Sequence, residues 1–316
     1  MTKLNPQKDI FLFYQKQKWD FVETYSQKSI SGFYAWYTRL IQALKSLGYE
    51  VHENNYELAL ANPTYPIGLV GTPDLLKNWA LPNPVILGPC MYDNPRLNPD
   101  LMNDHRFKLY LLTSDWFKKV FEEVYGDKCR LWFAGIPLEE WSDVKLEPKT
   151  IDVLIYDKIR WGKEAIRPLF VEPIEAYLTA KGLSYKILKY GEISHEVYRD
   201  YLSKSKSMLF LCESETQGMA YQEALASNIP VLAWDPGWWV DPVWLVFSTK
   251  PIPASSVPYF SPQCGEKFSD VRDFYKTFEL FWKNIKKYEP RDFIKNNLSL
   301  EKSGKLYADY YFGLLK

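Results

Sequence analysis

Short apolar runs alternate along the chain with polar loops and longer mixed stretches. The runs at 10–14, 65–70, 84–87, 107–112 and 131–133 are too short for a helix and are bounded by polar or turn-forming residues, so each predicts a buried strand. Between the first two, Ser31-Gly32 opens a stretch with the pattern of a helix of roughly fifteen residues, which Gly48 ends. Strands that alternate with helices are typical of a parallel sheet covered by helices.

The same alternation begins again after the polar segment 142–150, which we interpret as a linker. We therefore expect two Rossmann-like α/β domains in succession. The second series comprises predicted strands at 151–156, 185–188, 208–212 and 231–234, with predicted helices at 163–181, 195–204 and 219–227 between them. Three further helices are predicted after residue 270, at the C-terminal end of the sequence.

The stretch 206–235 has the clearest pattern in the chain. The apolar run 208–212 is followed by the polar loop ESETQG, and a helix rich in Ala, Leu, Gln and Glu then continues to Ser227. Asn228 ends this helix, and the strand 231–234 follows directly after Pro230. Ligands of parallel sheets bind outside the carboxyl ends of the strands, where ESETQG is expected to lie.

Two carboxylates stand on either side of Gly218 in this stretch. Glu215 is expected in the loop, and Glu223 is expected about one turn into the helix. The backbone amides of residues 217–220 would form the helix N-terminus, which is a ready site for an anion such as phosphate. A carboxylate beside such a site can bind sugar hydroxyls. The alternative interpretation of the same residues is that Glu215 caps the helix and Glu223 is a solvated helix residue.

Composition excludes several classes of protein. The 316 residues carry 39 basic and 39 acidic side chains, and this balance argues against nucleic acid as the main partner. We expect no membrane-spanning helix, because no apolar run approaches 18 residues, and no signal peptide, because MTKLNPQKD lacks an apolar core. The four cysteines are far apart, so we expect free thiols and no zinc site.

The stretch Glu-x7-Glu, with Gly218 three positions after the first Glu and EALAS-x-x-PV after it, resembles the donor-site motif of group-1 retaining glycosyltransferases of the GT-B fold. In that family the motif reads approximately E-x-F-G-x-x-x-x-E-A-x-A-x-G-x-P-V. Here Gln217 replaces the usual Phe and Asn228 replaces the Gly before the Pro. The segment TSDWFKKVFEEVYGDKCRLWFAGIPLEEW is similar to the end of the first domain in the same family.

A second constellation follows the strand IDVLIY. Lys158 and Lys163 are five positions apart, with Arg160 between them. The family has G-R-L-x-x-x-K-G at this point, so the resemblance places Lys158 where the family has Arg and Lys163 where it has Lys. Cations at these positions would stabilise the charge that develops on a diphosphate leaving group. The chain contains no Asp-x-Asp pair, so we expect no metal ion and no other cofactor.

The resemblance implies a GT-B architecture, in which two Rossmann-like domains face a cleft. It implies an acceptor domain at 1–145, a nucleotide-sugar donor domain at 146–290, and C-terminal helices at 291–316 that pack back on the first domain. Glu215, Lys163 and Asp93 are the candidate catalytic residues. The candidate donor-binding residues are Gly32, Lys158, Arg160, Lys163, Tyr190, Ile193, Glu215, Thr216, Gln217, Gly218, Met219 and Glu223.

Many family members carry a histidine in the first domain close to the reacting sugar. None of His52, His105 and His195 follows a strand in the expected way, and Asp93 in GPCMYDNPR is the titratable residue closest to where such a histidine would stand. A turn residue ahead of Pro95 is the alternative interpretation of Asp93. The family chemistry, in which a diphosphate oxygen takes the proton of the acceptor, requires no protein base.

The function expected is therefore a cytoplasmic, metal-independent retaining transferase of polysaccharide biosynthesis. It would move a sugar from a UDP or GDP sugar to a glycan, lipid-linked or small-molecule acceptor, and peripheral attachment to the inner face of a membrane stays open. Two alternatives stay open as well: a nucleotide-sugar epimerase on the same fold, and a catalytically degenerate GT-B protein that binds a glycan or a partner.

Overall fold

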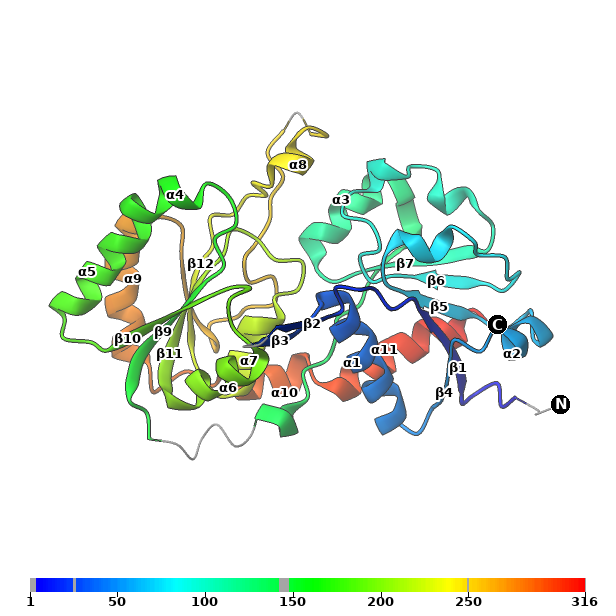
Figure 1. Cartoon of the computed structure of the whole chain (residues 1–316), viewed down its shortest axis with the longest axis horizontal. Helices are drawn as coiled ribbons and strands as arrows, with labels where there is room; N and C mark the ends of the chain where they lie inside the picture. Colours follow the sequence, from blue (N-terminus) through cyan, green and yellow to red (C-terminus); the bar gives the residue numbers. More distant parts are fainter. Residues whose placement is uncertain (1–3, 25–26, 142–147, 249, 316) are drawn as a thin grey trace. The chain divides into compact units, whose positions relative to one another are not determined.

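The computed structural model describes residues 4–24, 27–141, 148–248 and 250–315. The chain divides into two compact units, each built around a mostly parallel sheet (Figure 1). The first unit contains residues 1–22, 30–135 and 298–316, and the second contains 23–29 and 136–297. The predicted α/β class is confirmed. The linker predicted at 142–150 falls largely on residues 142–147, which lie outside the described residues, and so does the predicted domain boundary at 145/146.

The first unit contains a six-stranded sheet in the order β4-β1-β5-β6-β7-β8. Its strands are β1 (Asp9–Tyr14), β4 (Glu50–Glu53), β5 (Ile67–Val70), β6 (Val85–Leu87), β7 (Phe107–Leu112) and β8 (Cys129–Leu131), and its helices are α1 (Gly32–Ser46), α2 (Tyr56–Ala61), α3 (Asp115–Tyr125) and α11 (Leu300–Gly313). The last strand was predicted at 131–133 and lies at 129–131.

Helices α1 and α11 lie side by side over one face of this sheet, and α3 covers the other face (Figure 1). Ser31 caps α1 as expected, because its hydroxyl accepts a hydrogen bond from the Tyr34 backbone N–H. The Tyr311 hydroxyl of α11 accepts a hydrogen bond from the backbone N–H of Phe11, at 2.9 Å, and donates one to the carbonyl of Pro66, at 2.5 Å. The final helix is therefore fixed to two neighbouring strand segments of the first sheet.

The second unit contains a five-stranded parallel sheet in the order β10-β9-β11-β12-β13. Its strands are β9 (Ile151–Asp157), β10 (Tyr185–Lys189), β11 (Ser205–Leu211), β12 (Val231–Trp234) and β13 (Gly265–Phe268), and its helices are α4 (Lys163–Ile166), α5 (Glu172–Ala180), α6 (His195–Lys204), α7 (Met219–Ala226), α8 (Pro242–Leu245), α9 (Val271–Asn284) and α10 (Pro290–Asn297). A π-helical turn at Arg167–Val171 divides the predicted helix 163–181 into α4 and α5.

Helices α5 and α9 cover one face of the second sheet, and α6 and α7 cover the other (Figure 1). Alternate strand residues face the two layers, as the two-residue period of a strand requires. Val153 and Ile155 belong to the cluster that includes Phe274 and Phe278 of α9. On the other face, the Tyr156 ring meets the Tyr198 ring of α6 edge-on at 5.3 Å between centroids. The sheet is therefore buried on both faces, which explains the continuous apolar runs in the sequence.

Helix α10 differs from the prediction that residues 291–316 as a group pack on the first domain. It belongs to the second unit, whereas α11 belongs to the first. The reason lies in Arg291, whose guanidinium donates hydrogen bonds to the carbonyl oxygens of Ala226 in α7 and of Leu138, the latter at 3.0 Å. These bonds fix α10 beside α7, so only the last of the predicted helices belongs to the first unit.

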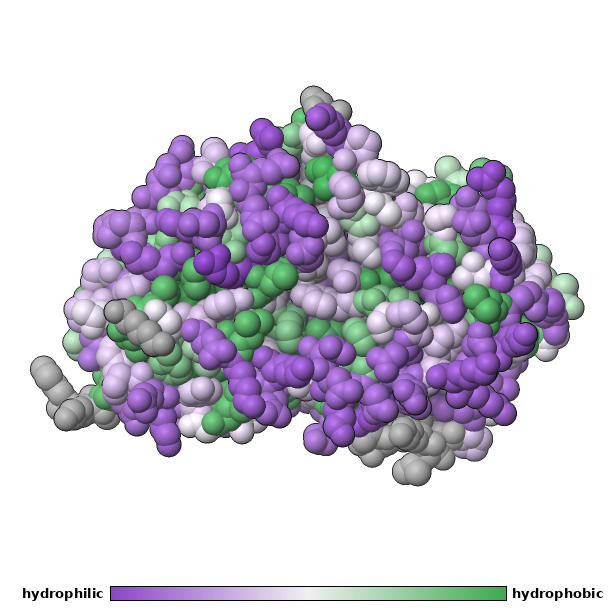
Figure 2. Space-filling model, turned by 180° about the vertical axis from the view of Figure 1, so that it is seen from behind, coloured by the Kyte–Doolittle hydropathy of each residue, from purple (hydrophilic) through white to green (hydrophobic). Residues whose placement is uncertain are grey.

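A separate two-stranded sheet, formed by β2 (Phe21–Thr24) and β3 (Gln27–Ile30), was not predicted, and neither were α2, α8 and β13. Hydrophilic residues cover much of the face shown in Figure 2, with apolar residues interspersed among them. No helix in the described ranges combines the length and the apolar run that crossing a bilayer requires.

The edge strand β13 depends on a glycine at its first residue. Gly265 has φ +140°, and a Cβ at this position would lie 1.9 Å from the backbone oxygen of Val231 in the neighbouring strand. We predict that Gly265→Ala lowers the free energy of unfolding by roughly 1–3 kcal/mol, because β13 must move away from β12. Urea unfolding followed by circular dichroism measures the change.

Gly313→Ala is the matched control, because a Cβ at Gly313 meets no atom within 4 Å and its φ is not positive. The control should leave the free energy of unfolding unchanged or raise it slightly, since alanine has fewer unfolded conformations than glycine. Equal stability of the two variants would contradict the account of β13.

Candidate functional site

The candidate site lies at the carboxyl ends of the second sheet. From β9 the chain first passes to β10 on one side and then crosses to β11 on the other, so the strand order reverses between β9 and β11. Asp157 ends β9 and pairs in register with Leu211, which ends β11. The loops that follow these two strands, 158–162 and 212–218, therefore leave the sheet side by side at a topological switch point, where such sheets bind ligands.

The central contact between the two loops is an ion pair between Lys158 and Glu215. The Lys158 ammonium contacts Glu215 Oε1, and their side chains are only 13% and 11% exposed. Burial by itself lowers the pKa of Lys158. The neighbouring Glu215 carboxylate raises the pKa, and its effect exceeds that of burial, so the pKa of Lys158 lies above its usual value. The Lys158 ammonium also lies 4.4 Å from the centre of the Tyr190 ring. Two candidates that are far apart in the sequence are thus in contact.

A second carboxylate, Glu213, fixes the path of the loop after β9. It is buried and accepts hydrogen bonds from the backbone N–H groups of Arg160 and Trp161, both at 2.9 Å. The Arg160 guanidinium donates to the backbone carbonyl of Ser214 at 2.8 Å. The candidate Arg160 therefore holds the two loops together. Its guanidinium already bonds to the backbone of the opposite loop, although the residue as a whole is exposed.

Lys163 begins α4 and lies next to a buried acid. Its ammonium is 3.4 Å from Oδ2 of Asp157, whose side chain is 1% exposed, while the Lys163 side chain is 35% exposed. The other oxygen of Asp157 accepts a hydrogen bond from the backbone N–H of Ile159 at 3.2 Å. Gly162, with φ +59°, turns the chain into the helix just before Lys163. The lysine is thus tethered at one side and open to solvent at the other, as a phosphate ligand needs to be.

The start of α7 follows the loop 212–218. Gly218 has φ +81°, and a Cβ there would lie 2.3 Å from the Tyr221 ring, so this position requires glycine. Because Gly218 carries no side chain, no side-chain cap covers the first backbone N–H groups of the helix. Thr216 is half-buried before the turn and Met219 is the first residue of α7.

Glu223 lies on the second turn of α7 and is buried. His195 Nε2 is 3.4 Å from Glu223 Oε2, and the His195 ring packs edge-on against the Trp141 ring at 5.2 Å between centroids. His195 is the first residue of α6, as expected, and its side chain is 54% exposed. The His195 ring is therefore partly exposed and also contacts the candidate carboxylate.

The candidate Gln217 is part of a buried amide network. Its Nε2 donates to Gln222 Oε1 and Gln222 Nε2 donates to the Gln217 carbonyl, both at 3.0 Å. This network packs the loop against α7, where the family motif has Phe. Tyr190 is 55% exposed and its backbone N–H donates to the Asp157 carbonyl at 2.9 Å, whereas Ile193 is half-buried in the loop before α6.

Two candidates belong to the first unit and are described with it. Gly32 is the first residue of α1 and is exposed, and a Cβ there would meet no atom within 4 Å. Asp93 is exposed in the loop that follows β6. Their roles stay predictions.

Across the described ranges, no group of three or more His, Cys, Asp or Glu side chains is arranged to hold a metal ion. All four cysteines are free and buried. Burial raises the pKa of the Cys90 thiol to about 12, so it is protonated at neutral pH. The expectation that the reaction needs no metal or cofactor stays a prediction.

Sequence reasoning missed Asp157, Glu213 and the contact of His195 with Glu223. A signal for the two acids exists in the sequence, because each stands at or just after the end of a predicted buried strand. No local pattern pairs His195 with Glu223, because the two helices that carry them meet only in the folded unit.

Comparison with solved structures identifies the fold class. A scan against protein-family models finds no match, and a search of curated proteins finds none either. Solved structures do match. A glycosyltransferase from Rickettsia africae ESF-5 has a TM-score of 0.62 at 11% identity, over 98% of this chain and 99% of that chain. The fold is GT-B.

Two further structures agree with the GT-B assignment. Sucrose-phosphate synthase from Thermosynechococcus elongatus has a TM-score of 0.56 at 12% identity, over 97% of this chain and 99% of that one. The catalytic domain of starch synthase IV from Arabidopsis thaliana, bound to ADP and acarbose, has a TM-score of 0.50 at 11% identity, over 90% of this chain and 78% of that one. The predicted GT-B fold class is confirmed.

The hydrogen bonds that Glu213 accepts predict how its removal changes the free energy of unfolding. Glu213→Ala should lower the free energy of unfolding by roughly 2 kcal/mol or more, because it leaves the two backbone donors of residues 160 and 161 without their acceptor. Glu213→Gln keeps one acceptor oxygen and should lose less. Urea unfolding measures both variants.

The exposed Glu164 of the same segment is the matched control, and Glu164→Ala should change stability by no more than about 0.5 kcal/mol. If Glu213→Ala were as stable as Glu164→Ala, the bonds of Glu213 would not hold the loop.

Proposed function

We propose that the protein is a glycosyltransferase that moves a sugar from a nucleoside-diphosphate sugar to a glycan, lipid-linked or small-molecule acceptor. The reaction would retain the configuration of the sugar and need no metal ion. One observation carries the proposal: the Lys158–Glu215 pair and Lys163 converge at the switch point of the second sheet, with Glu223 on the helix that follows. This arrangement provides cations for a diphosphate and carboxylates for sugar hydroxyls in one place.

Lys163 is the residue that we assign to the diphosphate. Its partly exposed ammonium can reach an anion while Asp157 holds it from the buried side. The uncapped backbone N–H groups at the start of α7 would add donors for phosphate oxygens. The structure of starch synthase IV contains ADP, which supports a nucleoside diphosphate as the ligand class on this fold.

Glu223 is assigned to the ribose. A buried carboxylate next to a phosphate site can accept hydrogen bonds from two neighbouring ribose hydroxyls. His195 and its contact with the Trp141 ring would hold that carboxylate in one orientation. Tyr190 and Ile193, in the segment between β10 and α6, are the candidates for contact with the base.

Glu215 is assigned to the transferred sugar. As the bond from the sugar's anomeric carbon to the diphosphate oxygen breaks, that oxygen keeps the electron pair and the anomeric carbon gains positive character. The acceptor hydroxyl forms the new bond to this carbon and gives its proton to the departing diphosphate. The Glu215 charge would favour the positive carbon, and Lys158 and Lys163 would favour the negative diphosphate.

Lys163→Ala should weaken binding of UDP or GDP by roughly ten- to a hundredfold, because a charge-assisted contact contributes about 1.5–3 kcal/mol. Binding of uridine or guanosine should hardly change. Isothermal titration calorimetry with these four ligands provides the test. Lys276→Ala, on the exposed surface of α9, is the control and should bind like the unmodified protein. An equal loss for nucleotide and nucleoside would show that Lys163 is not at the phosphates.

Glu215→Gln keeps the size of the side chain and removes its charge. We expect turnover to fall about a hundredfold or more, on the order of 3 kcal/mol, with nucleotide affinity nearly intact, because the lost contact tightens in the transition state. Glu223→Gln should instead weaken binding of donor and free nucleotide alike. Sugar transfer, or slow hydrolysis of the donor, measures turnover.

The variants are assayed well below their melting temperatures, because Glu215→Gln leaves the buried Lys158 without its partner. Full turnover in Glu215→Gln would reduce Glu215 to a structural residue and remove the main support for sugar transfer. Release of an altered donor sugar without transfer would favour an epimerase instead.

A further inference from the structure

Arg167 is a second cation beside the buried carboxylate of Asp157. It stands four positions after Lys163, where α4 ends and the π-helical turn begins, and residues four apart lie on the same side of a helix. Lys163 Nζ is 3.4 Å and Arg167 Nη1 is 4.0 Å from the same oxygen, Oδ2 of Asp157. One carboxylate oxygen therefore faces two cations from successive turns.

Asp157 depends on these cations because it is buried. Its side chain is 1% exposed, and Oδ1 accepts a hydrogen bond from the backbone N–H of Ile159 at 3.2 Å. Among the residues that the structure describes, none donates a hydrogen bond to Oδ2. A buried carboxylate that lacks compensation destabilises the fold. The charge at Oδ2 is therefore compensated by Lys163 and Arg167 through their positive charges.

The Arg167 guanidinium is fixed on the side that faces away from Asp157. Its Nη2 donates a hydrogen bond to Glu175 Oε1 at 2.8 Å, and its Nε lies 4.0 Å from Glu172 Oε1. Nη1, the nitrogen closest to Asp157, is buried and donates no hydrogen bond within the described ranges. A planar guanidinium can serve acids on two edges at once, which an ammonium cannot do from a fixed position.

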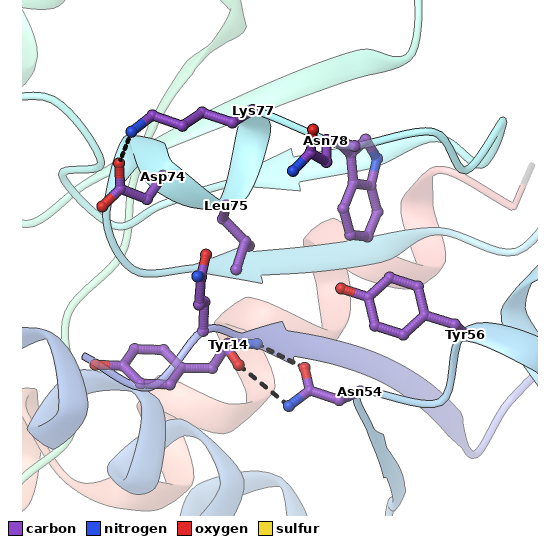
Figure 3. A pocket seen from close by; sticks show the side chains of 9 residues that line it. Tyr14, Asn54, Tyr56, Asp74, Leu75, Lys77 and Asn78 are labelled. Atoms are coloured by element: carbon purple, nitrogen blue, oxygen red, sulfur yellow. Dashed lines mark hydrogen bonds and ion pairs between the residues drawn. The ribbon is translucent and has the colours of Figure 1, made fainter. Parts of the chain in front are cut away.

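The first unit contains an Asp–Lys pair in a different environment. Lys77 Nζ lies 2.7 Å from Asp74 Oδ1, in the lining of a pocket (Figure 3). Their side chains are 74% and 40% exposed, so water screens both charges and the carboxylate needs no further cation. Asp157 lacks this screening, and the second cation beside it has a physical reason that is absent at Asp74.

The Lys163 ammonium has to serve both Asp157 and an incoming anion. Its side chain is 35% exposed, so an anion reaches the ammonium from the solvent side. The more strongly Asp157 attracts this ammonium, the less of its charge and of its N–H donors is available to the anion. A cation that stays beside Asp157 weakens that competition, and Arg167 is held there by Glu175.

We infer that Arg167 is a positioning residue for Lys163: it shares the buried charge of Asp157 and so leaves the Lys163 ammonium available to an anion. Arg167 acts through Asp157 and does not touch the ligand. The sharing rests only on the geometry of the three side chains. Its effect on a nucleoside diphosphate rests on the proposed function, in which Lys163 binds the phosphates.

Trace acetylation of the full chain with limiting acetic anhydride tests the sharing without any ligand. Arg167→Met should lower the acetylation of Lys163 roughly two- to fivefold, the factor of one partly exposed ion pair, because Asp157 then holds the ammonium alone and only the neutral amine reacts. In Asp157→Asn/Arg167→Met the acetylation should equal that of Asp157→Asn alone. Mass spectrometry measures both, with Lys77 as the internal reference that should not change.

Isothermal titration calorimetry with UDP, GDP and uridine tests the consequence for the ligand. Arg167→Met should weaken binding of UDP or GDP roughly three- to tenfold and leave uridine unchanged, whereas the same substitution in the Asp157→Asn background should have no effect. Arg272→Met is the matched control, because Arg272 pairs with Asp270 at 3.0 Å but is 88% exposed. It should bind like the unmodified protein. All variants are measured well below their melting temperatures.

Unchanged acetylation of Lys163 in Arg167→Met would overturn the inference. So would an equal loss of nucleotide affinity with and without the Asp157 carboxylate, because Arg167 would then contact the ligand itself or only support the fold. Nucleotide binding that Arg167→Met leaves intact contradicts the inference and spares the proposed function. If the unmodified protein binds neither UDP nor GDP, the proposed function fails, and the acetylation of Lys163 still decides whether Arg167 shares the charge.

Discussion

The structure depends on one constraint that both parallel sheets share. In each sheet the next strand is added on one side of the first strand, and the following strand is added on its other side. Crossover connections between parallel strands are right-handed, so a reversal sends successive helices to opposite faces of the sheet. In the second unit α5 lies on one face and α6 on the other (Figure 1). The loops that follow β9 and β11 therefore lead to helices on opposite faces, and Lys158 and Glu215 meet where the two loops leave the sheet.

Burial of charge at this point in the second unit is compensated by pairing. Lys158 and Glu215 are both nearly buried, and either charge without its partner would destabilise the folded unit. Glu213 is compensated by backbone N–H groups, and Asp157 by Lys163 and the N–H of Ile159. The charged groups of the site are therefore bonded to partners within the second unit. On our proposal, a nucleoside-diphosphate sugar adds its own negative charges beside Lys158 and Lys163, and the carboxylates bind its hydroxyls.

The sequence pattern predicted most of this framework. Buried parallel strands leave continuous apolar runs, and Ser31, which caps α1, stands where that helix begins. The four-residue strand β13 was not predicted, because its sequence GEKF carries two charges. It becomes a strand only through the close approach of Gly265 to Val231. The position of α10 in the second unit was not predicted, because it depends on the hydrogen bonds of Arg291 to residues far away in the sequence.

The candidate site was predicted less from pattern than from resemblance. Lys158 and Glu215 are 57 positions apart, and no local spacing pairs them. Glu213, two positions before Glu215, has the same residue type and a different task, which only the folded loop reveals. The packing of Tyr56 and Trp79 against Phe13 in the first unit could not be predicted, because the two rings come from separate segments.

A crystal structure of the protein with UDP or GDP tests the central claim most directly. The account predicts the diphosphate within about 3 Å of Lys163 Nζ, at charge-assisted hydrogen-bond distance, and the ribose hydroxyls at Glu223. A nucleotide bound away from the switch point of the second sheet, or no bound nucleotide at saturating concentration, would contradict the account.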